Sequence, residues 1–192
     1  MTTKKTNTRA MVECALMIAV GTVLAQIKIF EMPRGGSVTL VSMLPFIIVS
    51  FRHGLKWGLL TGFVNSLLQM LLGFYAPPAG TVTALICMVL LDYVLAFSVL
   101  GTACVFAKPF KNKIVGVGVA TASVCFMRFI CSFLSGALIW GSYQSSYEWA
   151  VGLSVWQYSF IYNMGYMLPE IILTTIAACL IAVAAPKFFD AQ

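Results

Sequence analysis

The amino-acid sequence predicts an all-α integral membrane protein with six transmembrane helices and with both termini on the cytoplasmic side. Composition is the first reason: 60% of the 192 residues are hydrophobic and 9% are charged, whereas a soluble domain has about 45–50% apolar and about 25% charged residues. The second reason is a succession of apolar runs, several of them near the roughly 20 residues that a membrane-spanning helix needs. The third is the placement of the cations along the chain.

The spans succeed one another without a linker long enough to divide the chain, so residues 1–192 are expected to form a single membrane domain. The first span comes after the polar MTTKKTNTR, the second lies between MPRGGS and FRHG, and the third ends before FYAPPAG. The second is short for a bilayer, so it is tilted, re-entrant or sheltered by its neighbours. The expected spans are residues 10–30, 39–52, 55–73, 81–106, 114–140 and 155–185.

Lysine and arginine give the orientation, because cytoplasmic loops of membrane proteins are enriched in both. Only Lys28 and Arg34 lie near an odd-numbered loop. The N-terminus, the even-numbered loops and the C-terminus carry Lys4, Lys5, Arg9, Arg52, Lys56, Lys108, Lys111, Lys113 and Lys187. Both termini are therefore expected in the cytoplasm. The net charge of +6 is explained by topology, which argues against nucleic-acid binding.

Several functional classes lack their sequence signals. The chain contains no GxxxxGK[ST] phosphate loop and no HExxH motif, and its one histidine, His53, is expected on a solvated cytoplasmic turn. Six cysteines lie singly in apolar runs, which indicates buried reduced thiols and neither a disulfide nor a metal site. No nucleophile and base stand at a plausible spacing, so an enzyme is the least favoured class and no cofactor is expected.

Asp92, near the middle of the fourth span, is the first candidate for a functional residue. A carboxylate there costs about 2.5–3.5 kcal/mol on insertion scales, so it should face a partner or a polar cavity. One interpretation is a structural ion pair with Arg128 of the fifth span. The favoured one is a counter-charge for a cationic ligand.

Two further helices carry polar and aromatic residues at four-residue spacing, which places each set on one helix face. The fifth span has Arg128, Ser132, Gly136 and Trp140, and the sixth has Tyr158, Tyr162, Tyr166 and Glu170 with Asn163 beside them. Small-residue packing and an aromatic belt explain part of both patterns. If the helices converge, Asp92, Trp140, Tyr158 and Asn163 form an aromatic-walled pocket for a flat, cationic, nitrogen-rich molecule.

The segment MPRGGSVTL is expected to be the first outer loop. Its Gly35 and Gly36, followed by Ser37, would let the backbone close over a ligand as a lid, while Pro33 limits the freedom of the loop. A tight helix connection is the alternative. On the first span, Ala15 and Ala19 lie about one turn apart and permit close helix contact, within the protein or with another membrane subunit.

The segments MPRGGSVTL, FRHGLKWGLLTGFVNSLLQ, LLDYVLAF, LSGALIWGSY and YSFIYNMGYMLP occur in an order that resembles the ThiT (YuaJ) family over nearly the whole chain. These are thiamin-binding S components of energy-coupling factor (ECF) transporters. The resemblance implies a multi-pass protein of the bacterial cell membrane that captures thiamin and docks on a transmembrane subunit and two ATPases. It assigns docking to Ala15 and Ala19, and the thiamin pocket to Asp92, Tyr93, Gly136, Trp140, Tyr158 and Asn163.

The chain departs from the family pattern at two places in this pocket. Ser132 stands where a histidine is expected, and Asp92 stands where a glutamate is expected. A related pyrimidine or another vitamin is therefore an alternative ligand, and a structural membrane protein without a transport role is a further alternative.

Overall fold

The computed structural model describes residues 2–191, and their side chains from residue 7 onward, so that the side chains of Lys4 and Lys5 lie outside the described part. The chain is built almost entirely of helices. In order, the elements are α1 (Thr2–Gln26), β1 (Lys28–Glu31), β2 (Ser37–Thr39), α2 (Leu44–Leu72), α3 (Val82–Met88), the π-helical η1 (Val89–Leu95), α4 (Ala96–Ser98), η2 (Val99–Thr102), α5 (Ala103–Ala107), α6 (Lys113–Leu138), η3 (Gly141–Ser146), η4 (Glu148–Ala150), α7 (Val155–Ala184) and η5 (Pro186–Phe189).

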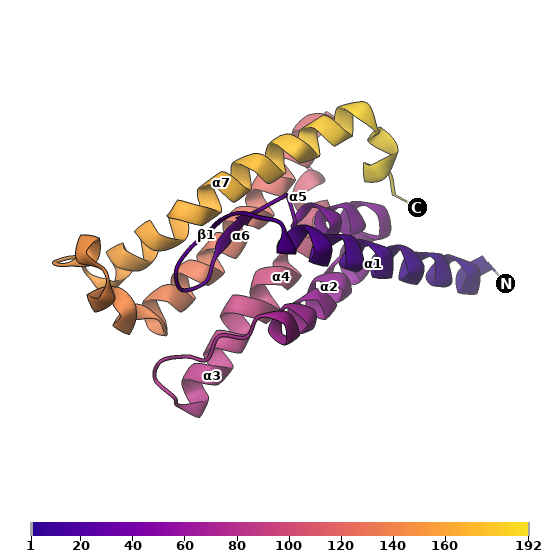
Figure 1. Cartoon of the computed structure of the whole chain (residues 1–192). Helices are drawn as coiled ribbons and strands as arrows, with labels where there is room; N and C mark the ends of the chain where they lie inside the picture. Colours follow the sequence, from indigo (N-terminus) through magenta and orange to yellow (C-terminus); the bar gives the residue numbers. More distant parts are fainter. Residues whose placement is uncertain (1, 192) are drawn as a thin grey trace.

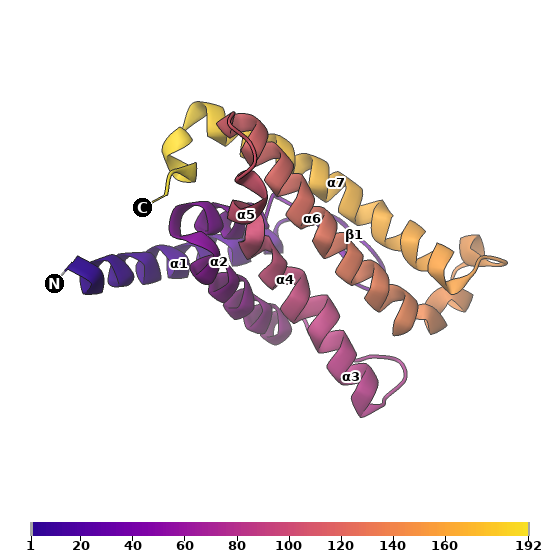
Figure 2. The same ribbon diagram turned by 180° about the vertical axis from the view of Figure 1, so that it is seen from behind.

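The predicted class, an all-α membrane protein, is confirmed. Within the described residues, 4 helical stretches are long and apolar enough to cross a bilayer: Asn7–Gln26, Val82–Ala107, Lys113–Leu138 and Val155–Ala184. Helices α6 and α7 pack along each other, and both chain ends lie at the same end of the bundle (Figures 1 and 2). The count of six spans and the cytoplasmic side of the termini remain predictions.

The first connection differs from the expectation of a helix over residues 10–30. Helix α1 ends at Gln26, and β1 pairs antiparallel with β2, with Lys28 opposite Thr39 and Glu31 opposite Ser37. The turn between the strands contains Gly35 and Gly36, whose φ angles of 90° and 89° are open to glycine at little cost. The first connection is thus a short hairpin, and the next helix begins at Leu44 and not near residue 39.

Helix α2 contains the second and third expected spans, divided by a sharp bend at Gly54. The backbone of Gly54 has φ 80° and ψ −176°, which no helical residue adopts. Ser50 and Gly58, four residues before and after Gly54, both contact Gly101. The Ser50 hydroxyl donates to the Gly101 carbonyl at 2.6 Å, and Gly58 packs on the Gly101 backbone. The chain therefore reverses at Gly54, as the separate spans 39–52 and 55–73 require.

Helices α3, α6 and α7 begin with side-chain caps that their sequences supply. The Thr81 hydroxyl accepts from the Ala84 amide before α3, the Asn112 side chain accepts from two amides before α6, and Ser154 and Gln157 form a capping box before α7. Helical structure then runs from Val82 to Ala107, close to the expected 81–106, although it changes geometry at η1.

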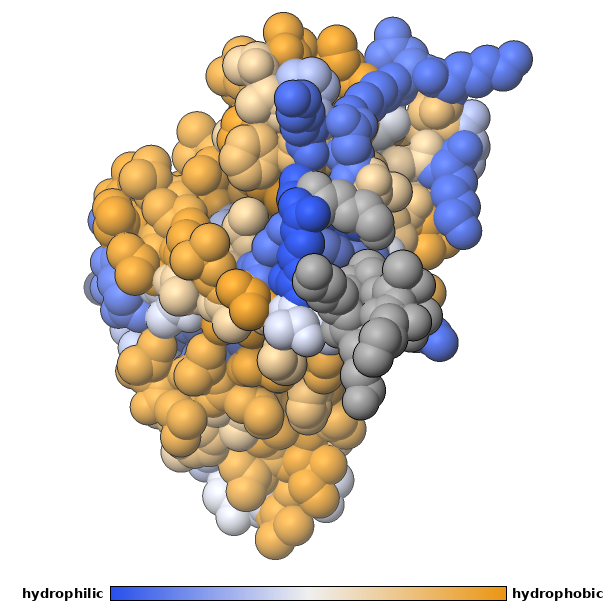
Figure 3. All heavy atoms as spheres, turned by 90° about the vertical axis from the view of Figure 1, so that its right-hand side faces the viewer, coloured by the Kyte–Doolittle hydropathy of each residue, from blue (hydrophilic) through white to orange (hydrophobic). Residues whose placement is uncertain are grey.

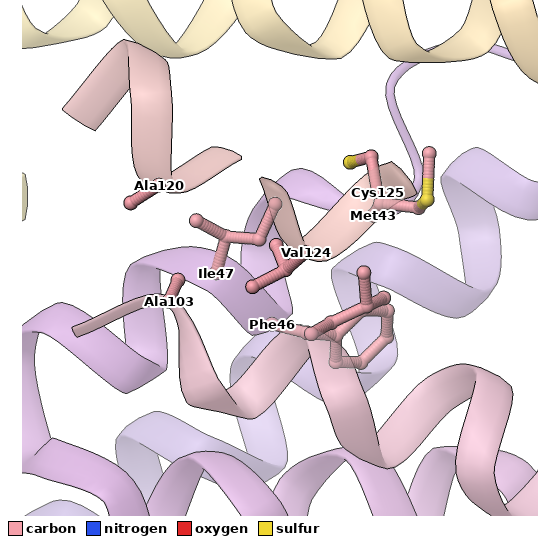
Figure 4. Close-up of a cluster of buried hydrophobic side chains, with 8 residues drawn as sticks. Met43, Phe46, Ile47, Ala103, Ala120, Val124 and Cys125 are labelled. Carbon is pink, nitrogen blue, oxygen red and sulfur yellow. The ribbon is translucent and has the colours of Figure 1, made fainter. Parts of the chain in front are cut away.

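The core that holds the bundle together lies between the first half of α2, α5 and α6. It contains Met43, Phe46, Ile47, Leu100, Ala103, Ala120, Val124 and Cys125 (Figure 4). Most large apolar side chains elsewhere are exposed, as in a protein whose outer surface contacts lipid. Seen from the end that carries the termini, hydrophilic residues extend from the centre to the upper right, and hydrophobic ones cover most of the left and lower parts (Figure 3).

His53 does not lie on a solvated surface, and that expectation was wrong. Its side chain is 6% exposed, and its Nε2 lies 2.9 Å from Oε2 of Glu13. The bend at Gly54 turns His53 inward toward α1, which the sequence alone did not reveal.

Replacing Gly101 by alanine should destabilise the fold. A Cβ at this position would collide with the backbone of Gly58 and Leu59, which cannot move aside as a flexible side chain can. Overpacking of this kind costs about 1–3 kcal/mol, or a fall in melting temperature of several degrees, measured by thermal unfolding in detergent. Gly165→Ala is the control, because its Cβ would meet only the Met32 methyl at 3.9 Å. Equal melting temperatures of the two variants would contradict the close packing.

Candidate substrate-binding site

A cavity of about 380 Å³ lies between the hairpin and helices α1, α2, α6 and α7, with η1 on the remaining side. This volume falls within the range of small-molecule sites, about 300–1,000 Å³. All residues that the sequence suggested for a pocket or lid line it: Gly35, Gly36, Ser37, Asp92, Tyr93, Gly136, Trp140, Tyr158 and Asn163. The three helices thus converge as the spacing arguments required.

Asp92 accepts two hydrogen bonds from α6 and the segment beyond its C-terminal end. The Ser135 hydroxyl donates to Oδ2 at 2.7 Å and the Trp140 indole Nε1 donates to the same oxygen at 2.9 Å. Within the described residues Oδ1 accepts no hydrogen bond. Neutral donors therefore hold the carboxylate in place, and one oxygen is left for a ligand.

The alternative interpretation, a structural ion pair between Asp92 and Arg128, is wrong. The described ion pairs do not join these two residues, and the Arg128 guanidinium carbon lies 4.4 Å from the centroid of the Phe97 ring. Both residues line the cavity, so the site contains a carboxylate and a guanidinium that do not neutralise each other by direct contact.

The local geometry of the fourth span aims Asp92 and Tyr93 at the cavity. Both belong to η1, where the helix widens into a π-helix, a form that is rare and frequent at functional sites. The Tyr93 hydroxyl donates to the Gly73 carbonyl at 2.9 Å, which ties this segment to the end of α2. No feature of VLLDYVL predicted the wider helix.

Trp140 connects the carboxylate to the hairpin through Tyr143. Its ring stacks on Tyr143, with centroids 5.9 Å apart and planes inclined by 22°. The Arg34 guanidinium carbon lies 3.9 Å from the centroid of the Tyr143 ring, a cation–π contact. One continuous set of contacts therefore runs from the hairpin to Asp92.

Gly136 permits close approach of α6 and α7. A Cβ there would lie 2.8 Å from Nδ2 of Asn163 and would collide with the Ser159 hydroxyl. Asn163 is fully engaged, since its Nδ2 donates to the Ser159 carbonyl at 2.8 Å and its Oδ1 accepts from the Tyr166 hydroxyl at 2.9 Å. Helix packing, the alternative considered for Gly136, thus describes its contacts, and the residue also lines the cavity.

An aromatic wall closes the side of the cavity formed by α7. Tyr158 stacks on Trp149, with ring centroids 5.6 Å apart, and packs on Tyr147 and Tyr162, each with centroids 5.8 Å away. Tyr147 and Trp149 come from the connection 141–154 between α6 and α7, which folds into two short 3₁₀ turns. The Gln144 amide nitrogen donates to the Ala150 and Leu153 carbonyls and so fixes this loop.

The hairpin lies across the cavity and is fastened to α7. The Tyr162 hydroxyl accepts from the Arg34 amide at 3.1 Å and donates to the Gly35 carbonyl at 3.0 Å. Gly36 lies so close to the Tyr166 ring that a Cβ would come within 2.6 Å of a ring carbon. Both glycines line the cavity, so the geometry is that of a covering segment.

The base of the hairpin is fixed by Glu170, which is 3% exposed. Its Oε2 accepts from the Thr39 amide and its Oε1 from the Thr39 hydroxyl, both at 2.6 Å. Val41, two residues after Thr39, has a φ of 51°, which is a strained backbone conformation for a β-branched residue. A carboxylate within an apolar span needs a partner, and Thr39 is the partner of Glu170. The chain then reaches α2 under strain.

Several lining residues were not selected from the sequence as site residues. Gln69, Arg128, Ser159 and Glu170 are polar residues within apolar spans, and that signal was present for each of them. Arg34 and Tyr143 gave a weaker signal, because charged and aromatic residues are common in loops. Within the described residues no three His, Cys, Asp or Glu side chains lie close enough to hold a metal ion.

Ala15 and Ala19 do not belong to the cavity. Both are exposed on α1, on a face that also carries Leu16 and Val20. The surface that they form is open to lipid or to another membrane protein.

Comparison with known proteins agrees with this architecture. Residues 11–190 match the model of a family described as thiamine transporter protein (Thia_YuaJ). The thiamine transporter ThiT of Bacillus subtilis (strain 168) is 33% identical over 195 residues, which covers 95% of this chain and 94% of the relative. A structure of ThiT from Listeria monocytogenes superposes with a TM-score of 0.77 at 21% identity, covering 97% of this chain and 100% of that one, and so shares its fold. The resemblance seen in the sequence is confirmed: the chain belongs to the thiamine transporter family, whose members are multi-pass proteins of the bacterial membrane and not enzymes.

Proposed function

We propose that this protein is a substrate-binding S component that captures thiamin outside the cell for ATP-driven uptake through an ECF module. The observation that carries the proposal is the Asp92 carboxylate, held by Ser135 and Trp140 with one oxygen directed to an aromatic-walled cavity. Membership of the thiamine transporter family supports the choice of ligand.

Thiamin joins a cationic thiazolium ring to an aminopyrimidine, and both rings suit this cavity. The free oxygen of Asp92 is an acceptor for the amino group or a counter-charge for the thiazolium. Trp140 and Tyr158 offer faces against which flat rings stack, and a cation over such a face gains about 0.5–2 kcal/mol. Gly136 lets α7 approach α6 closely, which brings Asn163 to the lining of the cavity beside these rings.

A related pyrimidine or another vitamin is the second candidate ligand. Ser132 lines the cavity in place of the histidine that the family resemblance leads one to expect, so one ring contact is absent or differently supplied. Arg128, one turn deeper on α6 and without an ion pair among the described residues, favours ligands that place a hydrogen-bond acceptor at that depth.

Coupling to an ECF module rests on two features. The chain has no phosphate-binding loop, so the energy for uptake must come from partner ATPases. Ala15 and Ala19 form a small-residue surface on an exposed face of α1, where a transmembrane subunit can approach closely. The hairpin with Gly35, Gly36 and Ser37 acts as the lid, because it covers the cavity and is fastened by hydrogen bonds that can break and reform.

Asp92→Asn should weaken thiamin binding about 10- to 100-fold, since a hydrogen bond to a charged group contributes about 1.5–3 kcal/mol. Isothermal titration calorimetry on the purified protein measures the affinity, with the pyrimidine fragment of thiamin titrated in parallel. Asp190→Asn is the control, because Asp190 pairs with Lys113 on the surface and does not line the cavity. Failure of the folded wild-type protein to bind thiamin would reject the proposed ligand.

Gly36→Ala should weaken thiamin binding about tenfold more than Gly35→Ala. Both residues have positive φ, so both variants bear a similar backbone cost of about 1–2 kcal/mol. Only Gly36 would place a Cβ within 2.6 Å of the Tyr166 ring, whereas a Cβ at Gly35 meets Tyr75 at 3.9 Å. The same calorimetric assay compares the two, and equal losses would argue that the hairpin does not close tightly over the ligand.

Ala19→Phe should abolish thiamin uptake by cells while leaving thiamin affinity unchanged, because the enlarged side chain keeps a partner helix away from α1. Uptake of radiolabelled thiamin and the calorimetric affinity are the two measurements. Cys87→Phe, an equivalent enlargement on the exposed face of α3, is the control and should leave both unchanged. Normal uptake by the Ala19 variant would move the docking surface elsewhere.

A further inference from the structure

Glu13 stands at the centre of a charged cluster that the binding site does not use. Its Oε1 accepts from Arg9 Nε at 3.1 Å, and its Oε2 lies 2.9 Å from both Arg52 Nε and His53 Nε2. The Arg52 guanidinium also donates to the Lys187 carbonyl at 3.0 Å. The cluster thus joins α1, the bend of α2 and the C-terminal segment in one network.

Apart from this cluster, α1 is held mainly by apolar packing on α2. Of its described residues only Ala10, Cys14 and Gly21 are buried, while Val12 and Leu16 are exposed. Glu13 lies within the stretch Asn7–Gln26 that is apolar enough to cross a membrane, where an unpaired carboxylate is costly. The cluster is therefore the strongest directional attachment of the first half of α1.

The other end of α1 belongs to the cavity and its cover. Gly21, Ala25 and Gln26 line the cavity, and Ile27 alone separates α1 from β1. The Ile27 carbonyl accepts from the Leu40 amide at 3.1 Å, so the hairpin is joined to α1 without a flexible linker. Helix α1 and the hairpin are therefore expected to move together, although Glu13 and the start of β1 are about 20 Å apart along the helix.

The hairpin is thus held at both ends by carboxylates, Glu13 and Glu170, whose partners belong to the protein itself. Glu13 fixes its α1 end through the helix, and Glu170 fixes its other end through Thr39. The strained φ of Val41 lies directly beyond the second anchor. A segment under such strain keeps its conformation only while the surrounding contacts hold it.

From this arrangement we infer that Glu13 is a positioning residue for the hairpin: by fixing the half of α1 that lies away from the hairpin, it keeps the hairpin closed over the site. The effect on the hairpin does not depend on which ligand the cavity binds. Its consequence for ligand retention rests on the proposed function.

Amide hydrogen exchange of the ligand-free protein in detergent, followed by mass spectrometry, tests the inference. In Glu13→Ala, exchange in residues 28–39 should accelerate about tenfold, within the range of coupling between distant sites, while α6 and α7 keep their wild-type protection. Glu13→Gln retains the size of the side chain and loses its charge, so its exchange rate in residues 28–39 should lie between those of the wild type and Glu13→Ala. It replaces the alanine variant if that variant does not fold. Arg9→Ala is the matched control, because Arg9 is 65% exposed and its loss leaves Arg52 and His53 on Glu13.

A purely structural role gives a different pattern. If exchange rises in α1 alone, or rises equally throughout the molecule, Glu13 does not position the hairpin and the inference fails. Thiamin dissociation measured by stopped-flow fluorescence provides the second readout, with a rate about tenfold higher in the Glu13 variants and within about twofold of wild type in Arg9→Ala. A wild-type protein that does not bind thiamin rejects the proposed function but leaves the exchange result decisive for Glu13.

Discussion

A carboxylate within a bilayer must find its partners inside the protein, because hydrocarbon offers none. Three carboxylates in helices of this protein meet that demand differently. Glu13 is surrounded by cations, and both oxygens of Glu170 accept from Thr39. Asp92 receives two neutral donors on one oxygen, while its other oxygen accepts no hydrogen bond from the part of the chain that the structure describes. Glu13 and Glu170 therefore hold segments of the protein together, whereas Asp92 has an oxygen that a bound ligand can use.

The contacts around Asp92 extend to the segment that covers the site. Trp140 touches the carboxylate and Tyr143, and Tyr143 lies beneath the Arg34 guanidinium of the hairpin. A ligand that shifts the Trp140 ring would therefore also shift Tyr143, on which Arg34 of the hairpin packs. Tyr162 provides a parallel connection on the α7 side, since one hydroxyl bonds two consecutive residues of the hairpin. If the cavity binds its ligand as proposed, occupancy and closure of the hairpin would be linked through these direct contacts.

Much of this arrangement could be predicted from the sequence, because bilayer thickness and helix periodicity leave few alternatives. The apolar runs revealed the helices, and the four-residue spacing on α6 and α7 placed Trp140 and Tyr158 on the cavity side. The hairpin, the inward turn of His53 and the partners of Asp92 could not be predicted in this way. Each depends on contacts between residues distant in the chain: Lys28 with Thr39, His53 with Glu13, and Asp92 with Ser135.

Because Val89–Leu95 is π-helical, the number of residues in this segment determines which side chains face the site. A π-helix accommodates an additional residue within a turn, so the helix on either side keeps its packing while the residues within the turn change the face that they present. Each residue gained or lost in a regular helix rotates all subsequent residues by about 100°. A one-residue deletion that restored regular geometry here would leave a hydrophobic span of nearly unchanged composition, yet it would turn Asp92 or Tyr93 away from the cavity. A one-residue insertion or deletion in this turn is therefore expected to impair substrate binding, even though it hardly changes the hydropathy of the span and leaves Asp92 and Tyr93 in the sequence.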